Sequence, residues 1–370
     1  MCSSDLQVGG RESVIAADHV VICAGQEPLR DLQAGLQAAG CSVHLIGGAD
    51  KAVELDAKRA IKQGTELAIA MDELPGAQKP AAKNQATKPG ATASGSKTAV
   101  ESFTTLRLAV EGHVATVHLN RPDKANAMNL AMWHELRQAF DWIDTQPEVR
   151  VAVLRGEGKQ FCAGIDLEMM MGLGQQIQDD CDGRTRENLR RVILDLQDCL
   201  SSLERCRKPV LAAIHGACVG GGIDLVCCAD MRYCSSDATF SIKEIDLGMT
   251  ADVGTLQRLP KLISEAMVRE LAFTGRRFDA HEALGLQMVN KVFESPEALQ
   301  QGVAAMAAEI AAKSPLAIRG IKEMLNYARD HSVADGLRQV ATWNAAMLMS
   351  ADLQEAVMAK MGKRKPEFKN

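Results

Sequence analysis

The 370-residue sequence lacks several features that would each point to a particular class of protein. No apolar run approaches the roughly 20 residues of a membrane-spanning helix, and the N-terminus lacks the charged and apolar segments of a signal peptide. The net charge of -5 gives no basic surface for binding nucleic acid. These absences predict a cytoplasmic protein with no membrane partner and no nucleic-acid partner.

The eleven cysteines form no C-x-x-C pair, the spacing typical of zinc sites and of thioredoxin-like redox sites. We therefore expect buried, reduced thiols rather than a disulfide framework, and no metal site. Hydrophobic residues make up 46% of the chain and charged residues 24%. This balance is ordinary for a globular protein and is sufficient for a sizeable core.

Composition divides the chain into three parts. Residues 76–101 are rich in Ala, Lys, Pro, Gly, Ser and Thr and contain almost no large apolar side chains. Such a segment cannot bury enough surface to order itself, so we expect a flexible linker. It separates residues 1–75 from a body at residues 102–370, whose C-terminal part is expected to be helical from about residue 300 onward.

Residues 1–75 alternate between strand-like and helix-like runs. "HVVICAG" and "SVHLIGGAD" are typical of buried strands, and each is followed by a helical pattern. The segment resembles the C-terminal end of bacterial flavin- and NADPH-dependent 2,4-dienoyl-CoA reductases. It has no G-x-G-x-x-G fingerprint and is too short to surround a dinucleotide. We therefore expect a partial nucleotide-binding α/β segment, a remnant without a working flavin or NADPH site.

The first six residues, "MCSSDL", fit nothing that follows them. They are also what a common sequencing-adapter sequence encodes in one frame. Our hypothesis is that the reading frame starts artificially inside a longer reductase gene. A native N-terminus reading Met-Cys-Ser-Ser-Asp would contradict it.

The body begins with two alternating apolar runs around Glu111-Gly112, a pattern that predicts a β-hairpin. "AMNLAMWHELRQAFDWIDT" and "ENLRRVILDLQDCLSSLERC" predict amphipathic helices, while "VRVAVLRGEG" and "PVLAAIHG" predict buried strands. Short strands that alternate with helices predict an α/β fold. Periodicity alone does not identify the fold further.

Two glycine-containing turns follow strands, "FCAGIDL" at 161–167 and "HGACVGGGIDL" at 215–225. Such turns leave free backbone N–H groups that suit a developing negative charge, although tight packing would also explain them. Taken with "RPDKANAMN", "IKEIDLGMTADVGTLQRLP" and their intervals, they resemble the enoyl-CoA hydratase/isomerase (crotonase) superfamily over about 102–365. Within it, the dienoyl-CoA isomerases are the most similar branch.

The resemblance implies a spiral of ββα turns with a C-terminal helical region, and trimers that often pair into hexamers. It also implies an acyl-CoA substrate and no cofactor. The thioester oxygen would lie between the backbone N–H groups of Ile165 and Gly221. Residues implied to contact CoA are Lys124, Ala125, Asn126, Ala163 and Asp166. Lys124 and Asn126 could equally belong to a solvated turn.

Three carboxylates carry the implied chemistry, namely Asp224, Glu244 and Asp252. A hydratase would need only the first two, and Asp252 is the additional one. Converting a 3,5-dienoyl-CoA to a 2,4-dienoyl-CoA in fatty acid β-oxidation removes a proton from C2 and delivers one to C6, several ångström away. Our hypothesis assigns Asp252 as the base at C2 and protonated Glu244 as the acid at C6, with Asp224 holding Glu244. The two roles could be exchanged.

Other interpretations remain open at this point. Asp224 could simply cap a helix, and Asp246 is expected to be structural or solvated. His215 is expected to be a packing residue, and Cys227 and Cys228 to be core. The alternative functions are an enoyl-CoA hydratase, a non-catalytic acyl-CoA-binding or RNA-associated protein and, disfavoured by the missing fingerprint, a bifunctional reductase-isomerase.

Overall fold

The computed structural model describes residues 103–370 continuously and, before them, four strands and a few helical positions. The chain divides into two compact units, Met1–Ala93 and Ser94–Asn370. In the first unit β1 pairs antiparallel with β2, and β3 pairs parallel with β4. Their bounds are β1 Ser3–Val8, β2 Arg11–Ala16, β3 His19–Ala24 and β4 Ser42–Gly47.

The strands expected at "HVVICAG" and "SVHLIGGAD" are therefore confirmed as β3 and β4. The hairpin β1–β2 was not expected, although the Gly9-Gly10 pair between its strands is a hairpin signal. Most of the helix-like runs of this unit and the whole proposed linker, 76–101, lie outside the described residues. The division at residues 75 and 101 stays a prediction.

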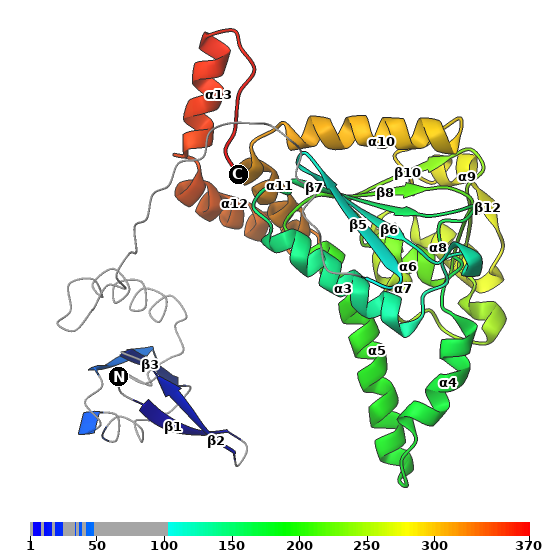
Figure 1. Ribbon diagram of the computed structural model, residues 1–370, viewed down its shortest axis with the longest axis horizontal. Coiled ribbons are helices and arrows are strands. Elements are labelled where there is room, and N and C mark those ends of the chain that lie inside the picture. Colours follow the sequence, from blue (N-terminus) through cyan, green and yellow to red (C-terminus); the bar gives the residue numbers. More distant parts are fainter. Residues whose placement is uncertain are drawn as a thin grey trace. The chain divides into compact units, whose positions relative to one another are not determined.

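The second unit contains a six-stranded sheet in the order β13-β10-β8-β7-β6-β5 (Figure 1). Neighbouring strands are parallel except for the antiparallel pair β5–β6, the expected hairpin around Glu111-Gly112. The strands are β5 Leu106–Glu111, β6 Val114–Leu119, β7 Val151–Gly156, β8 Val210–Ile214, β10 Met231–Ser235 and β13 Lys291–Phe293.

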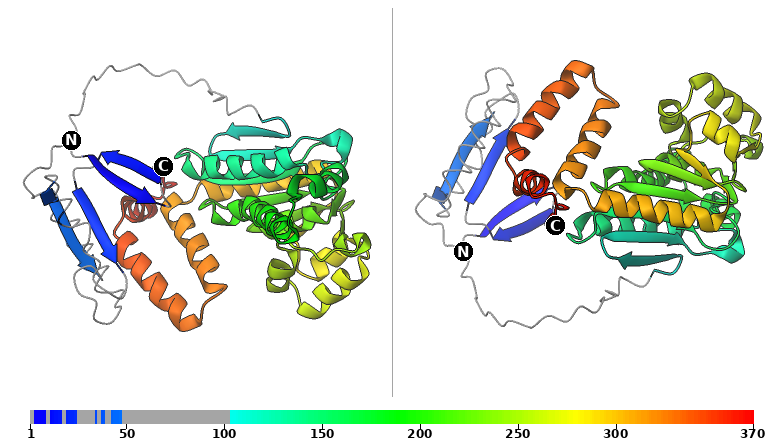
Figure 2. Two further views of the ribbon diagram at one scale, coloured as in Figure 1. Left: turned by 90° about the horizontal axis from the view of Figure 1, so that it is seen from below. Right: turned by 90° about the horizontal axis from the view of Figure 1, so that it is seen from above.

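The sheet is covered on both faces, which explains the continuous apolar runs of its central strands. In β7, Val151 and Val153 belong to a cluster with α10, whereas Ala152 and Leu154 belong to the main core beneath α3 and α5. Figure 2 shows α10 running along one side of the sheet. The covering helices are α3 Leu130–Thr145, α5 Asp182–Arg205 and α10 Pro296–Ala311.

A second, three-stranded sheet has the order β12-β11-β9. The chain passes from β8 directly to β9 and from β10 directly to β11, so each of these two turns of chain gives one strand to each sheet. This repeat is the expected spiral of ββα turns. The three strands are β9 Ala217–Val219, β11 Thr239–Ser241 and β12 Phe278–Asp279.

Short helices line the connections between these strands. Helix α4 precedes α5, α6 follows β9, and the stretch that begins at Glu244 folds as two 3₁₀ turns with a single α-helical turn between them. Their bounds are η2 Pro122–Lys124, α4 Leu167–Ile177, α6 Gly221–Cys227, η3 Glu244–Leu247, α7 Thr255–Arg258, η4 Leu259–Lys261, α8 Glu265–Thr274 and α9 Ala280–Gly285.

The last seventy residues are helical, as expected, and end in a short tail. After α10 come α11 Pro315–Ala328, α12 Val333–Met347 and α13 Ala351–Met361. Lys322 of α11 is buried and forms a 2.7 Å ion pair with Asp230, which ties this region to the sheet domain. In the described part of the chain, no helix has the length and apolar character needed to cross a membrane.

Candidate active site

The two glycine turns lie against each other. Gly164 and Gly220 have φ angles of 93° and 52°, which non-glycine residues rarely adopt. A β-carbon on Gly164 would lie 3.4 Å from the nitrogen of Gly221, and one on Gly221 would lie 3.7 Å from the nitrogen of Ile165. The turns therefore bring the two backbone N–H groups named from the sequence into one place.

Both N–H groups are free to bind a ligand. Met128 bridges to the first turn by donating to the carbonyl of Gly164 and accepting from the N–H of Asp166. Because Met128 uses the residues on either side of Ile165, the Ile165 N–H points away from it. Gly221 opens α6, where the first N–H groups have no partner within the helix. Within residues 103–370 neither group donates a hydrogen bond.

Asp224 is a buried carboxylate rather than a helix cap. It is the fourth residue of α6 and is 0% exposed. Its Oδ1 accepts a 2.6 Å hydrogen bond from the N–H of Thr255, while its Oδ2 has no partner among the described residues. Burial raises the pKa of Asp224 to about 6 against the effect of that hydrogen bond.

Glu244 begins η3 and reaches toward the second glycine turn. Its Oε1 lies 3.2 Å from the position of a β-carbon on Gly220, and its buried Oε2 has no partner within the described residues. Burial, and next the charge of Asp224, raise the pKa of Glu244 to about 7. Glu244 is therefore suited to carry a proton at neutral pH.

Asp252 lies in the loop between η3 and α7. Its backbone carbonyl accepts a 2.6 Å hydrogen bond from the side-chain amide of Gln197 on α5. Burial raises the pKa of the Asp252 carboxyl, and the charge of Asp252 in turn raises the pKa values of Asp224 and Glu244. The charge of Asp252 therefore acts on both of the other carboxylates.

The residues named for CoA binding lie on two adjoining loops, since the N–H of Ala163 donates to the carbonyl of Ala125. Lys124 and Ala163 are exposed, and Lys124 forms a 3.2 Å ion pair with Glu168. Asn126 is fully buried, and its side chain bonds to the backbone N–H of Arg121 in its own loop and to the carbonyls of Glu157 and Gln160. The loops are exposed where CoA could reach them, but the Asn126 side chain is not.

Asp166 is also occupied within the protein. Its carboxylate caps α4 by accepting from the N–H of Glu168, and it forms a 2.7 Å ion pair with Arg121. Arg121 donates in addition to the carbonyl of Ala127, within its own loop. The Asp166 side chain therefore joins the two loops, which shapes the site without itself facing a ligand.

The structural expectations for other residues are confirmed. His215 is buried and its Nε2 lies 3.0 Å from the carbonyl of Gly158, and Cys227 and Cys228 lie in the core. Asp246 is exposed and pairs with Lys243. The eight cysteines of the described body all carry free thiols, and seven of them are buried.

Sequence reasoning missed three residues that contact the carboxylates or their loop. They are Thr255, which donates to Asp224, and Gln197 and Arg258, which donate to backbone carbonyls of the Asp252 loop. Thr255 and Arg258 lie inside the stretch "GTLQRLP" used for the resemblance. Gln197 carries no local signal, because its contact joins residues 55 positions apart.

Comparison with known proteins agrees with this geometry. The family model for enoyl-CoA hydratase/isomerase matches residues 109–370. The chain is 49% identical over 273 residues to the peroxisomal Delta(3,5)-Delta(2,4)-dienoyl-CoA isomerase of Arabidopsis thaliana, covering 73% of this chain and 98% of that protein. It is 47% identical over 260 residues to the mitochondrial enzyme of Homo sapiens, covering 70% and 79% of the two chains.

A solved structure named as an enoyl-CoA hydratase from Bacillus anthracis superposes with a TM-score of 0.66 and 29% identity, covering 72% of this chain and 99% of that one. The expectation of a cytoplasmic location was wrong, because these isomerase relatives are named as peroxisomal and mitochondrial. Overall composition does not distinguish these compartments. Because the family model matches residues 109–370, most of the chain, and the paired glycine turns are in place, this chain belongs to the enoyl-CoA hydratase/isomerase family.

Proposed function

We propose that this protein isomerises 3,5-dienoyl-CoA to 2,4-dienoyl-CoA in the β-oxidation of unsaturated fatty acids. The observation that carries the proposal is the third carboxylate, Asp252, in the loop that leads to α7, whose charge raises the pKa values of Asp224 and Glu244. The relatives named as dienoyl-CoA isomerases support the same reaction. A reaction that exchanges protons at two separated carbons requires more than one acid/base group.

The proposed reaction begins when the carboxylate of Asp252 removes a proton from C2. The C–H electron pair forms a C1=C2 double bond and the carbonyl pair moves onto the thioester oxygen, which gives the enolate. As the oxygen pair re-forms the carbonyl, the C1=C2 pair moves to C2=C3, the C3=C4 pair moves to C4=C5, and the C5=C6 pair takes a proton at C6 from Glu244. The negative charge that develops on the thioester oxygen is stabilised by the N–H groups of Ile165 and Gly221. Each such donor typically contributes about 3 to 4 kcal/mol at the transition state.

The assignment of the two roles rests on their surroundings. Glu244, with a pKa raised to about 7, holds a proton more readily than an ordinary glutamate and is the proposed acid. Asp252 is the proposed base, and buried Asp224 keeps a negative potential near Glu244 that favours its protonated form. After each turnover the proton on Asp252 must return to Glu244, directly or through solvent.

For CoA we propose that Lys124 contacts the nucleotide end, together with the exposed backbone near Ala125 and Ala163. Asn126 and Asp166 would contribute by fixing the position of these loops, because their side chains are used internally. The reaction moves a proton and a set of double bonds with no net oxidation. The proposed chemistry therefore requires no flavin, nicotinamide or metal.

We also propose that the protein assembles into trimers, which can pair into hexamers. The support is the set of large apolar side chains exposed along α11–α13 and the turns between them, a concentration typical of surfaces that bind another protein chain. Examples with their exposed fractions are Leu325 67%, Val333 81%, Leu337 64%, Met349 87% and Met358 61%. Light scattering coupled to size-exclusion chromatography would test this, and a monomeric mass would contradict it.

The test of function is a parallel assay of the purified chain with a 3,5-dienoyl-CoA and with a 2-enoyl-CoA. Formation of the conjugated 2,4-dienoyl chromophore faster than hydration is the expected result. Fast hydration without a dienoyl product would instead identify a hydratase that uses Asp224 and Glu244 and carries Asp252 incidentally. Binding of both thioesters without turnover would identify an acyl-CoA-binding protein.

A further inference from the structure

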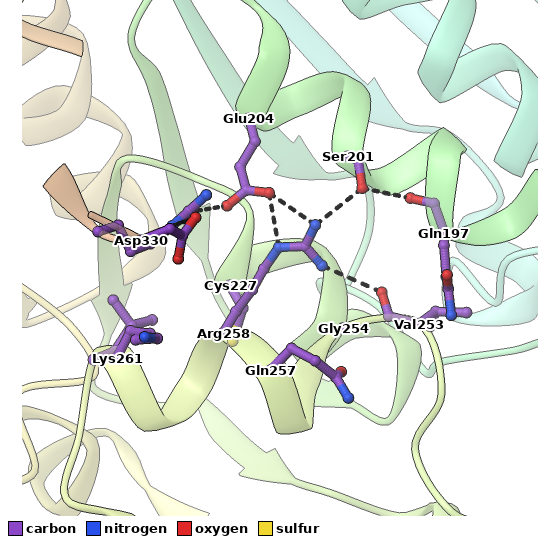
Figure 3. A pocket seen from close by; sticks show the side chains of 12 residues that line it. Gln197, Ser201, Glu204, Cys227, Val253, Gly254, Gln257, Arg258, Lys261 and Asp330 are labelled. Carbon is purple, nitrogen blue, oxygen red and sulfur yellow. Dashed lines mark hydrogen bonds and ion pairs between the residues drawn. The ribbon is translucent and has the colours of Figure 1, made fainter. Parts of the chain in front are cut away.

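A pocket of about 430 Å³ lies behind the loop that carries Asp252, between α5 and α7 (Figure 3). Its wall includes Val253 and Gly254, the two residues that follow Asp252. None of the three carboxylates lines it. The pocket therefore exposes the rear of the Asp252 loop, where polar side chains of the surrounding helices contact its backbone.

Two side chains donate to consecutive carbonyls of this loop. The amide of Gln197 donates to the carbonyl of Asp252 at 2.6 Å, and the guanidinium of Arg258 lies 3.4 Å from the carbonyl of Val253. Consecutive peptide units fixed in this way leave the intervening backbone little freedom to rotate. The direction of the Asp252 carboxylate then depends on these two contacts.

Arg258 is itself held in one orientation. Its Nε and Nη2 donate to Oε2 of Glu204 at 2.9 and 2.8 Å, and Nη2 also lies 3.0 Å from the hydroxyl of Ser201. The Arg258 and Glu204 side chains are each only 16% exposed. As Figure 3 shows, the guanidinium lies between α5 and the Val253 carbonyl. A partly buried pair of this geometry is far more rigid than an exposed ion pair.

The glycine next to this contact gives independent support. Gly254 has a φ angle of 138°, and a β-carbon there would lie 1.9 Å from Nη1 of Arg258. The guanidinium therefore occupies the space that any other residue's side chain would need. The loop is shaped around Arg258 as well as bonded to it.

From these contacts we propose that Gln197 and Arg258 are positioning residues for the C2 base: they fix the Asp252 loop to α5. The inference rests on the proposed function of Asp252. Proton removal is sensitive to small displacements of the base, and an error near 1 Å can lower the rate about 100-fold. The two residues act through Asp252 and are not expected to touch substrate.

The experiment uses the full chain with Gln197→Leu, which removes the donor, and Arg258→Lys, which keeps the charge but cannot hold Glu204 and the loop together. Each variant is expected to lower kcat about 10- to 100-fold, with KM changed less than about threefold. Exchange of the C2 hydrogen with D₂O should fall in parallel. The matched control is Gln257→Leu, an exposed residue of α7 in the same pocket, which should retain wild-type kcat.

Each substitution is then combined with Asp252→Asn. If Gln197 acts through Asp252, adding Gln197→Leu to Asp252→Asn lowers the residual kcat no further, because the group it positions is gone. Independent, multiplicative losses would overturn the inference, as would a folded Gln197→Leu variant with wild-type kcat. If Gln197→Leu does not fold, Arg258→Lys decides by the same criteria. If Asp252→Asn is inactive while the Gln197 and Arg258 variants have normal kcat, the positioning role is rejected and the proposed function stands. If Asp252→Asn is fully active, the proposed role of Asp252 itself is rejected.

Discussion

The backbone N–H of Thr255 donates a 2.6 Å hydrogen bond to Oδ1 of Asp224. This bond joins α6, which starts at the glycine turn, to α7, which follows the Asp252 loop. It satisfies one oxygen of a fully buried carboxylate and leaves the other without a partner among residues 103–370. The free energy of folding must therefore depend on whether Asp224 is protonated.

We expect the contribution of Asp224 to wild-type stability to fall as pH rises from about 4 to 6. The folded-state pKa of Asp224 is about 6 and its ordinary value is 3.8, so the folded state retains a proton that the unfolded state releases in this interval. The shift corresponds to about 3 kcal/mol, which is lost once the pH exceeds the folded-state pKa. Asp224→Asn should reduce the difference between the unfolding free energies measured by urea titration near pH 4 and near pH 7. Asp246→Asn, at an exposed carboxylate, is the control. If the free energy of unfolding changed equally between pH 4 and pH 7 in both variants, Asp224 would not be the group responsible.

Asp252→Asn and Glu244→Gln are each expected to lower kcat by about 10² to 10⁴, the usual contribution of a positioned acid or base. Isotope position separates their roles. With Asp252 as the base, Asp252→Asn should abolish exchange of the C2 hydrogen, whereas Glu244→Gln should preserve it and block deuterium entry at C6. Mass spectrometry of products formed in D₂O measures both, and the opposite pattern would exchange the two roles.

The pH profile of kcat/KM should be bell-shaped. Glu244 must be protonated to act as the acid, and its pKa is about 7, so the rate should fall as pH rises above about 7. Asp252 must be ionised, so the rate should also fall at low pH, and its raised pKa moves that limb upward from the ordinary range. Glu244→Gln should lose the alkaline limb. A rate that rises through pH 7 would mean that Glu244 acts as a base.

The helices and strands that the sequence predicted are those in which the spacing of apolar residues shows which side chains are buried. In β7 every second residue belongs to the same apolar cluster, and in α3 the buried positions Met132, Trp133, Leu136, Ala139 and Phe140 recur at helical spacing. Because these patterns involve residues close together in the chain, they can be recognised from the sequence alone. The carboxylates were found through resemblance, since no periodicity links Asp224 to Asp252.

The contacts that the sequence did not predict are long-range bonds from side chains to backbone. Asn126 illustrates this. The family resemblance implied a CoA contact for it, and a solvated turn was the alternative, whereas its amide bonds to the carbonyls of Glu157 and Gln160, more than thirty residues away. Gln197 is hidden for the same reason. Many polar side chains are able to bond to distant backbone groups, so the residue type alone does not show which side chains form such bonds.

The last prediction tests the backbone N–H pair, which side-chain removal cannot reach. In Gly164→Ala the new β-carbon would lie 2.9 Å from the Val219 carbonyl and 3.4 Å from the Gly221 nitrogen, so the two donors must move apart. We expect kcat to fall about 10²- to 10³-fold, as for loss of one oxyanion donor. Gly112→Ala is the control, because Gly112 also has a positive φ, 57°, but nothing lies within 4 Å of its β-carbon position. Both variants carry the backbone strain, and only Gly164→Ala disturbs the donors, so equal kcat values in the two would place the thioester oxygen elsewhere.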